Sequence, residues 1–159
     1  MRSRRVYEYL AIMKRIENES RGVVRLRDIS RAMNIKPASA HEYLEKLSSS
    51  GYVEKIKRGE YRVSKRGERE LILRMWAHGV IETYLHKILG IDPDKACLIA
   101  SKIDYIMPLD AVEKLCAALG HPSRCPHNHL IPHKDHGLIS ENDKYLLCFT
   151  YNISYRSKE

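Results

Sequence analysis

Apolar residues recur at intervals of three and four from the start of the chain, which is the spacing of one helix face. The pattern predicts a helix over residues 3–18, a shorter one over residues 26–35 and a third over residues 37–50. Pro37 suits the first turn of the third helix, and Gly51 suits its end. The inward-facing positions are Val6, Leu10, Met13, Ile16, Ile29, Met33, Ala40, Leu44 and Leu47.

Strand-forming residues follow Gly51 and flank the turn Arg58-Gly59-Glu60, so residues 52–64 predict a β-hairpin. The strand formers are Tyr52, Val53, Ile56, Tyr61 and Val63. Two short helices joined by a tight turn and followed by a hairpin make a winged helix-turn-helix. The second of those helices, residues 37–50, would read the major groove of DNA.

Helical spacing returns in the second half, where residues 65–89 predict one long helix and residues 93–107 and 109–119 predict two shorter ones. The last helix turns Val112, Leu115 and Leu119 inward. Three helices are too few to bury their apolar faces within one protomer, so we expect a homodimer. The expected fold class is mainly α, with an N-terminal winged helix-turn-helix over residues 1–70 and an α-helical dimerisation domain over residues 71–137.

The C-terminal tail, residues 138–159, alternates apolar and polar positions between Lys144 and Tyr155, which predicts a β-strand. A strand with one apolar face needs a partner. We expect it to pack on the dimerisation helices or to pair with its counterpart in the other subunit.

The excess of positive charge lies entirely in the first half of the chain. Residues 1–75 hold 19 Lys and Arg against 10 Asp and Glu, a net charge of +9, whereas residues 76–159 hold 9 against 10. This asymmetry and the winged helix favour double-stranded DNA as the partner, with protein contacts as the alternative. The expected DNA-contacting residues lie early or outward on the reading helix and on the wing: Lys36, Ala38, Ser39, His41, Glu42, Lys57, Arg58 and Arg62.

The long helix carries two polar residues on its inward face, His78 and Glu82. Because they are four residues apart, both side chains can reach one ion. A surface pair or a helix-packing pair is the plainer interpretation of the same spacing. On the next helix, Cys97, Ser101 and Asp104 also fall on one face, together with Tyr105.

The segment GHPSRCPHNHLIP, residues 120–132, concentrates potential metal ligands. A tetrahedral zinc ion is compatible with its Cys-x-His-x-His spacing, although that spacing matches no well-known zinc module. The residues in question, with two histidines that follow, are Cys125, His127, His129, His133 and His136. A structural role for Cys125 and His127 is the favoured alternative.

The order of winged helix, linking helix, AHGVIETYLHKILGID, ASKIDYIMPLDAVEKL and GHPSRCPHNHLIP resembles the iron- and manganese-dependent repressors of the diphtheria-toxin-repressor type. The likeness covers residues 6–132, and the loop is its most distinctive part. In that family the loop mainly shapes the exit from the dimerisation helices. Longer members carry a further SH3-like barrel, for which residues 138–159 are too few.

The resemblance implies that sensing metals bridge the first helix, the linking helix and the dimerisation helix, and so fix the angle between the two DNA-reading heads. Carried over to this chain, one ligand set is His78, Glu82 and Cys97. Because a thiolate is a soft ligand, this set suits Zn²⁺ or Fe²⁺ better than Mn²⁺.

The second ligand set of the family falls on Glu8, Ser101, Asp104 and Tyr105. Serine is a poor neutral ligand, and a phenol with a pKa of about 10 rarely binds divalent iron or manganese. This site is therefore expected to be degenerate, with Glu8 and Asp104 as its remaining, less favoured candidate ligands.

The resulting hypothesis is a cytoplasmic, dimeric transcription regulator, a repressor by resemblance, that binds a pseudo-palindromic operator and responds to Fe²⁺, Mn²⁺ or Zn²⁺. A metal-independent or redox-responsive regulator of the same fold is the alternative. An enzyme using Cys97 or Cys125 is disfavoured, since the chain shows no phosphate loop, nucleotide fingerprint or Ser/His/Asp pattern. No apolar run approaches the roughly 18 residues of a membrane span, and no membrane partner is expected.

Overall fold

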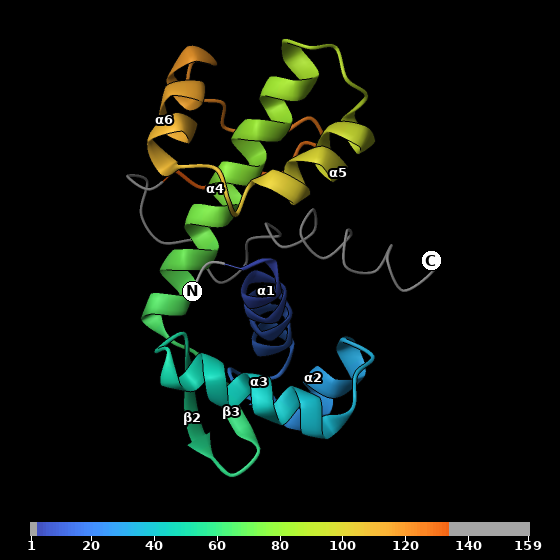
Figure 1. The fold of residues 1–159 in the computed structure, drawn as a ribbon, viewed down its shortest axis with the longest axis vertical. Helices are drawn as coiled ribbons and strands as arrows, with labels where there is room; N and C mark the ends of the chain where they lie inside the picture. Colours follow the sequence, from blue (N-terminus) through green and yellow to red (C-terminus); the bar gives the residue numbers. More distant parts are fainter. Residues whose placement is uncertain (1–2, 134–159) are drawn as a thin grey trace. The chain divides into compact units, whose positions relative to one another are not determined.

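The computed structural model describes residues 3–133, which form two compact units, Ser3–Leu71 and a second that begins at Ile72. The element order is three helices with a short strand between the first two, a hairpin, and three further helices (Figure 1). The mainly helical class with a winged helix-turn-helix is confirmed. The predicted strand in the tail and residues 134–137 of the second domain lie outside the described residues.

In the first unit, helix α1 (Arg4–Glu19) buries the predicted face of Val6, Leu10, Met13 and Ile16. Helix α2 (Leu26–Ala32) is shorter than predicted, because Asn34 adopts a positive φ of 51° and ends the helical path. Helix α3 (Pro37–Ser49) begins at the expected proline and turns Ala40, Leu44 and Leu47 inward.

The hairpin pairs β2 (Val53–Lys57) with β3 (Glu60–Val63) in antiparallel register, so its connection is the two residues Arg58 and Gly59 and not three as predicted. Gly59 has a φ of 76°, a conformation that costs glycine little. A two-residue strand, β1 (Val24–Arg25), pairs with the other edge of β3 and was not predicted. Two residues are too few to show a period-two pattern.

The start of helix α4 (Lys65–Lys87) is held against the wing. A Cβ atom on Gly67 would clash with the Tyr52 carbonyl oxygen, so only glycine allows this approach. The buried Glu17 carboxylate accepts a 2.5 Å hydrogen bond from the Val63 amide, and Lys14 pairs with both Glu17 and Glu68. These contacts fasten α1 to β3 and to the first turn of α4.

The second unit contains the rest of α4 with α5 (Pro93–Ile103) and α6 (Leu109–Ala118). Helix α5 stops at Ile103, short of the predicted residue 107, as the chain turns before Pro108, which disfavours helical geometry in the residue before it. The apolar core of this unit joins all three helices to the loop: Trp76, Ala77, Val80, Cys97, Val112, Cys116, Cys125 and Ile131.

The loop after α6 lies close against α4. A Cβ atom on Gly79 would lie 2.6 Å from Cγ1 of Ile131, a side chain that is itself buried. The glycine therefore lets the loop reach the helix directly beside His78. Among the described residues, no helix is both long and apolar enough to cross a membrane.

Candidate metal centre

His78, Glu82 and Cys97 meet inside the second unit, where all three side chains are buried. The Nε2 atom of His78 lies 3.4 Å from the Cys97 Sγ atom and 3.5 Å from Oε2 of Glu82. One helical turn on α4 supplies the first two residues, and the packing of α5 on α4 supplies the third. The structure thus brings together the trio that the sequence singled out.

Asp104 fixes the orientation of the His78 ring. The Nδ1–H group of His78 donates a 2.9 Å hydrogen bond to Asp104 Oδ2, which leaves Nε2 facing Cys97 and Glu82. A carboxylate behind a ligating histidine is the usual arrangement at metal sites. The second Asp104 oxygen lies 2.5 Å from the Arg74 guanidinium, so this carboxylate is engaged on both sides.

The surroundings raise the pKa of both His78 and Glu82. Burial lowers the pKa of His78, but its hydrogen bonds to Asp104 and Cys97 outweigh that effect and raise it to about 10. Burial raises the pKa of Glu82 to about 8, against the lowering effect of His78. Among the described residues, Glu82 Oε2 is buried without a hydrogen-bond partner. A divalent cation would displace the Nε2 proton and satisfy this oxygen.

The loop adds Cys125 and His127 to the edge of the centre. His127 donates from Nδ1 to Glu82 Oε1 at 2.6 Å and from Nε2 to Asp94 Oδ1 at 2.8 Å. Burial lowers the pKa of His127, but these two carboxylates raise it to about 9. Because both ring nitrogens face carboxyl groups, a protonated His127 donates on both sides and places a positive charge beside Glu82. Glu82, Cys125 and His127 form a second group with metal-ligand atoms close together.

The donor set tests whether a divalent metal fits. Imidazole, carboxylate and thiolate are the ligands of catalytic and regulatory zinc and iron sites. The distances from His78 Nε2 to Cys97 Sγ and to Glu82 Oε2 are 3.4 and 3.5 Å. Around a tetrahedral zinc ion with bond lengths of about 2.0–2.3 Å, ligand atoms lie roughly 3.3–3.6 Å apart, so the two distances match. The donor types and these two distances therefore fit such an ion.

Arg74 occupies the surroundings of the residues assigned to the second ligand set. Its Nη2 atom lies 2.5 Å from Asp104 Oδ1 and 3.4 Å from the Ser101 carbonyl oxygen, and its guanidinium lies 5.2 Å from the Tyr105 ring centre. A fixed side-chain cation thus stands beside these positions. Glu8 belongs to the first unit, where its carboxylate accepts a 2.9 Å hydrogen bond from Arg4.

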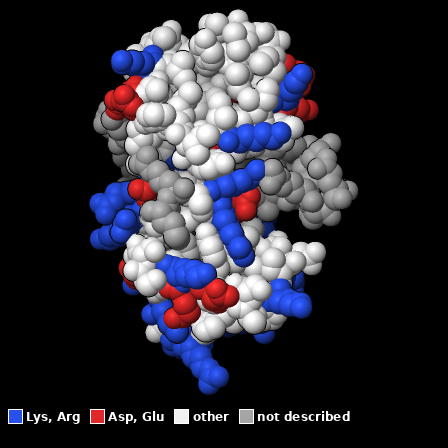
Figure 2. Space-filling model, viewed as in Figure 1, with Lys and Arg blue, Asp and Glu red and all other residues white. Residues whose placement is uncertain are grey.

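All eight predicted DNA-contacting residues are exposed. On α3, His41 lies 3.1 Å from the Tyr61 hydroxyl, and Glu42 pairs with Lys46. On the wing, Lys57 pairs with Glu60 at 3.3 Å and Arg62 with Glu54 at 2.6 Å. Figure 2 shows Lys and Arg side chains projecting from the hairpin end of the first unit. Exposed basic groups on a wing suit contacts to phosphates.

Three residues beside the centre were not among the sensor ligands expected from the sequence. Cys125 and His127 were expected to be structural, and nothing in their spacing indicated Glu82, which is 45 positions from His127. Arg74 was not considered, although a charged residue inside an apolar helix face signals a buried partner. That partner, Asp104, lies 30 positions away in the sequence.

The winged helix and the buried ligand cluster define a DNA-binding protein of the metal-regulated class, and comparisons agree. The N-terminal DNA-binding domain of iron-dependent repressors matches residues 1–60, and the metal-binding and dimerisation domain of the same repressors matches residues 64–133. The chain belongs to this family of iron-dependent repressors, which are transcriptional repressors and not enzymes. No significant relative was found among curated protein sequences.

Solved structures show the same fold. A hypothetical protein from Sulfolobus solfataricus is 35% identical, with a TM-score of 0.76 over 82% of this chain and 99% of that chain. IdeR from T. acidophilum is 29% identical, with a TM-score of 0.62 over 84% of this chain and 62% of that one. ScaR with bound Zn²⁺ is 23% identical, with a TM-score of 0.72, 84% coverage of this chain and 62% of that one. The chain thus matches less than two thirds of the length of the latter two.

Proposed function

We propose that this chain is a homodimeric, cytoplasmic transcriptional repressor whose affinity for a pseudo-palindromic operator is set by a divalent metal ion bound at His78, Glu82 and Cys97. The observation that carries the proposal is the convergence of their ligand atoms around the His78 Nε2 atom, with Asp104 holding the opposite side of the ring. The family of DNA-binding and metal-binding domains supports both halves of the activity.

When bound, the ion would supply a positive charge that ties α4 to α5 at one buried point. Neighbouring residues of the chain orient the ligand atoms at that position. Asp104 keeps one proton on His78 Nδ1 and so directs Nε2 toward the ion. His127 neutralises the Glu82 oxygen on the loop side, which leaves the other oxygen for the ion. The thiolate of Cys97 favours Zn²⁺ or Fe²⁺ over Mn²⁺.

DNA recognition would use α3 in the major groove and the β2–β3 wing on the backbone. The outward residues of α3 supply base contacts, and the wing residues Lys57, Arg58 and Arg62 supply phosphate contacts. In a homodimer, two such heads meet half-sites one helical turn or a multiple of it apart. The metal acts by binding more tightly to the dimer conformer in which both heads fit the DNA.

Asp104 is proposed as the residue that orients His78 and not as a direct ligand, because both of its oxygens are engaged by His78 and Arg74. Glu8, a member of the second ligand set, belongs to the other unit and is not part of the proposed sensor centre. The second ligand set is proposed to be inactive as a metal site, with the Arg74 cation beside Ser101, Asp104 and Tyr105.

The test is fluorescence anisotropy with DNA from the upstream region of the protein's own gene, at fixed salt, since phosphate contacts make affinity salt-dependent. Protein stripped with chelator is titrated with Fe²⁺, Mn²⁺ or Zn²⁺ under reducing conditions. We expect specific binding to tighten at least about tenfold, a coupling of about 1.4 kcal/mol. His78→Ala should abolish this response and leave the affinity of the metal-free protein unchanged.

His86→Gln is the matched control, because His86 lies on the same helix outside the metal-ligand groups found among the described residues. It should keep the full metal response. Equal binding by stripped and loaded wild type would overturn the sensor. A change produced by peroxide, and absent in Cys97→Ser, would establish the redox-responsive alternative.

A further inference from the structure

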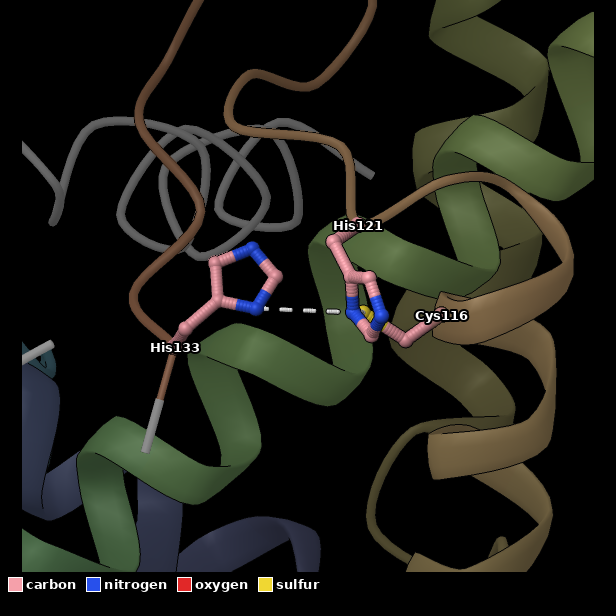
Figure 3. A group of neighbouring side chains, drawn as sticks. All are labelled: Cys116, His121 and His133. Atoms are coloured by element: carbon pink, nitrogen blue, oxygen red, sulfur yellow. Dashed lines mark hydrogen bonds between the residues drawn. The ribbon is translucent and has the colours of Figure 1, made fainter. Parts of the chain in front are cut away.

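A third cluster of metal-ligand atoms lies away from the sensor trio and shares no residue with it. Cys116 lies in the last turns of α6, His121 follows that helix, and His133 lies beyond the loop. The Cys116 Sγ atom is 3.5 Å from His121 Nδ1 and 3.8 Å from His133 Nδ1, and the three atoms lie within 4.8 Å of one another. Their side chains point toward one another (Figure 3).

These separations are those of zinc ligands. With Zn–S near 2.3 Å and Zn–N near 2.0–2.1 Å, a tetrahedral ion separates a sulfur from a nitrogen by about 3.6 Å. The two observed separations, 3.5 and 3.8 Å, lie on either side of that value. A single thiol proton can serve only one of two imidazole nitrogens, whereas an ion would engage both.

The tautomer of His133 also suits a ligand. Its Nε2 atom lies 3.0 Å from the Pro122 carbonyl oxygen, which can only accept, so Nε2 carries the proton. In the neutral ring the lone pair is then on Nδ1, the atom that faces Cys116. A backbone carbonyl behind a ligating histidine is a common support at metal sites.

The exit from α6 directs His121 toward the cluster. Gly120 and His121 both adopt positive φ, 72° and 55°, and the His121 amide donates a 2.9 Å hydrogen bond to the Cys116 carbonyl oxygen. A left-handed conformation is uncommon outside glycine and persists where the surroundings hold it. This turn folds His121 back over the residue that supplies the thiol.

We propose that Cys116, His121 and His133 bind a zinc ion that is separate from the sensor. One soft thiolate and two imidazoles select Zn²⁺ over Mn²⁺, Mg²⁺ and Ca²⁺. Cys116 is buried, whereas His121 is exposed, so the ion is reached from solvent and keeps an open position for water. The ion joins α6 to the far end of the loop that also carries Cys125 and His127 beside Glu82.

The test uses Co²⁺ as a spectroscopic probe of zinc sites in the full chain. A background variant, Cys97→Ser with Cys125→Ser, removes the thiols of the sensor centre, so the result is independent of the proposed function. Reduced, metal-free background protein is titrated with Co²⁺, and the near-ultraviolet thiolate-to-cobalt band is recorded. We expect one tightly bound Co²⁺ with that band, which Zn²⁺ displaces.

Adding Cys116→Ser to the background should remove the band. Adding His121→Gln or His133→Gln should weaken Co²⁺ binding at least about tenfold, since even loss of an outer contact to a metal ligand costs 10–100-fold. His129→Gln, which changes a loop histidine outside the trio, should leave the band and the affinity unchanged. Far-ultraviolet circular dichroism confirms that each variant is folded.

Two results would overturn the assignment. One is a background protein that binds no Co²⁺ through thiolate, or whose band is the same with and without Cys116→Ser. The other is a band that Cys116→Ser removes while both histidine variants bind Co²⁺ as tightly as the background does.

Discussion

Replacing Arg74 by methionine should destabilise the second unit strongly. The guanidinium and the Asp104 carboxylate are 2.5 Å apart, and their side chains are 4% and 0% exposed, so solvent screens this pair little. Methionine keeps most of the apolar stem but removes the guanidinium, which leaves the buried carboxylate with His78 as its remaining partner. Breaking a buried ion pair from one side costs about 3–5 kcal/mol. With a urea m-value of about 2 kcal/mol/M, the unfolding midpoint should fall by about 1.5–2.5 M.

The chain contains one tryptophan, Trp76, which is buried in the core of the second unit. Its fluorescence during urea unfolding therefore reports on the unit that contains the ion pair. The measurement uses chelator-treated, reduced protein at one fixed concentration, because dimerisation makes apparent stability depend on concentration. Arg69→Met, an exposed arginine on the same helix, is the control and should change stability by less than about 0.5 kcal/mol.

The double variant Arg74→Met with Asp104→Asn separates charge from packing. The asparagine amide oxygen would still accept a hydrogen bond from His78, but the side chain would bury no charge. We expect the double variant to regain most of the stability that Arg74→Met removes. A midpoint shift below about 0.5 M for Arg74→Met, equivalent to about 1 kcal/mol, would refute the reasoning, as would a double variant no more stable than the single one.

Three further outcomes are expected. Gly79→Ala should lower the free energy of unfolding by up to about 2 kcal/mol, because overpacking against Ile131 costs about 1–3 kcal/mol and the gain in helix propensity is only about 1 kcal/mol. Urea unfolding followed by Trp76 fluorescence measures this loss. The loss should be smaller in an Ile131→Ala background, and additive losses would contradict the contact between residues 79 and 131. Burial raises the pKa of Glu17, so its folded form binds protons more readily than its unfolded form. Wild type should therefore gain stability relative to Glu17→Gln as the pH falls from 7 towards 4.5, measured by far-ultraviolet circular dichroism, whereas a pH-independent difference would rule this out. Arg58→Ala should reduce the salt slope of DNA binding by about 0.9 for each phosphate that the arginine neutralises, and an unchanged slope would remove Arg58 from the interface.

The sequence predicted the elements whose signals are local. Helical spacing at Val6, Leu10 and Met13 led directly to α1, and Pro37 marked the start of α3. The predicted end of a helix was wrong where the conformation of a single residue determines it, as with the positive φ of Asn34 after α2. Strand β1 was not predicted, because two residues cannot show an alternating pattern and these two form a strand only by pairing with β3.

The candidate site was only partly predictable for a related reason. His78 and Glu82 share one helix face, so their spacing alone places them together. Their neighbours arrive from far along the chain, and no local pattern encodes the approach of His127 to Glu82 or of Arg74 to Asp104. The distinctive loop was noticed for its composition, but only the fold shows that Cys116 lies beside His121 and His133.

If the sensor acts as proposed, metal binding and DNA binding must strengthen each other, and this reciprocal coupling can be measured. The affinity of the wild-type protein for Zn²⁺ is measured by competition with a chromogenic chelator, with and without saturating operator DNA, at the same salt and pH. Thermodynamic linkage requires DNA to tighten metal binding by the same factor as the metal tightens DNA binding. We expect a factor of at least about ten, or 1.4 kcal/mol, that disappears in His78→Ala. Equal metal affinity with and without DNA would contradict it.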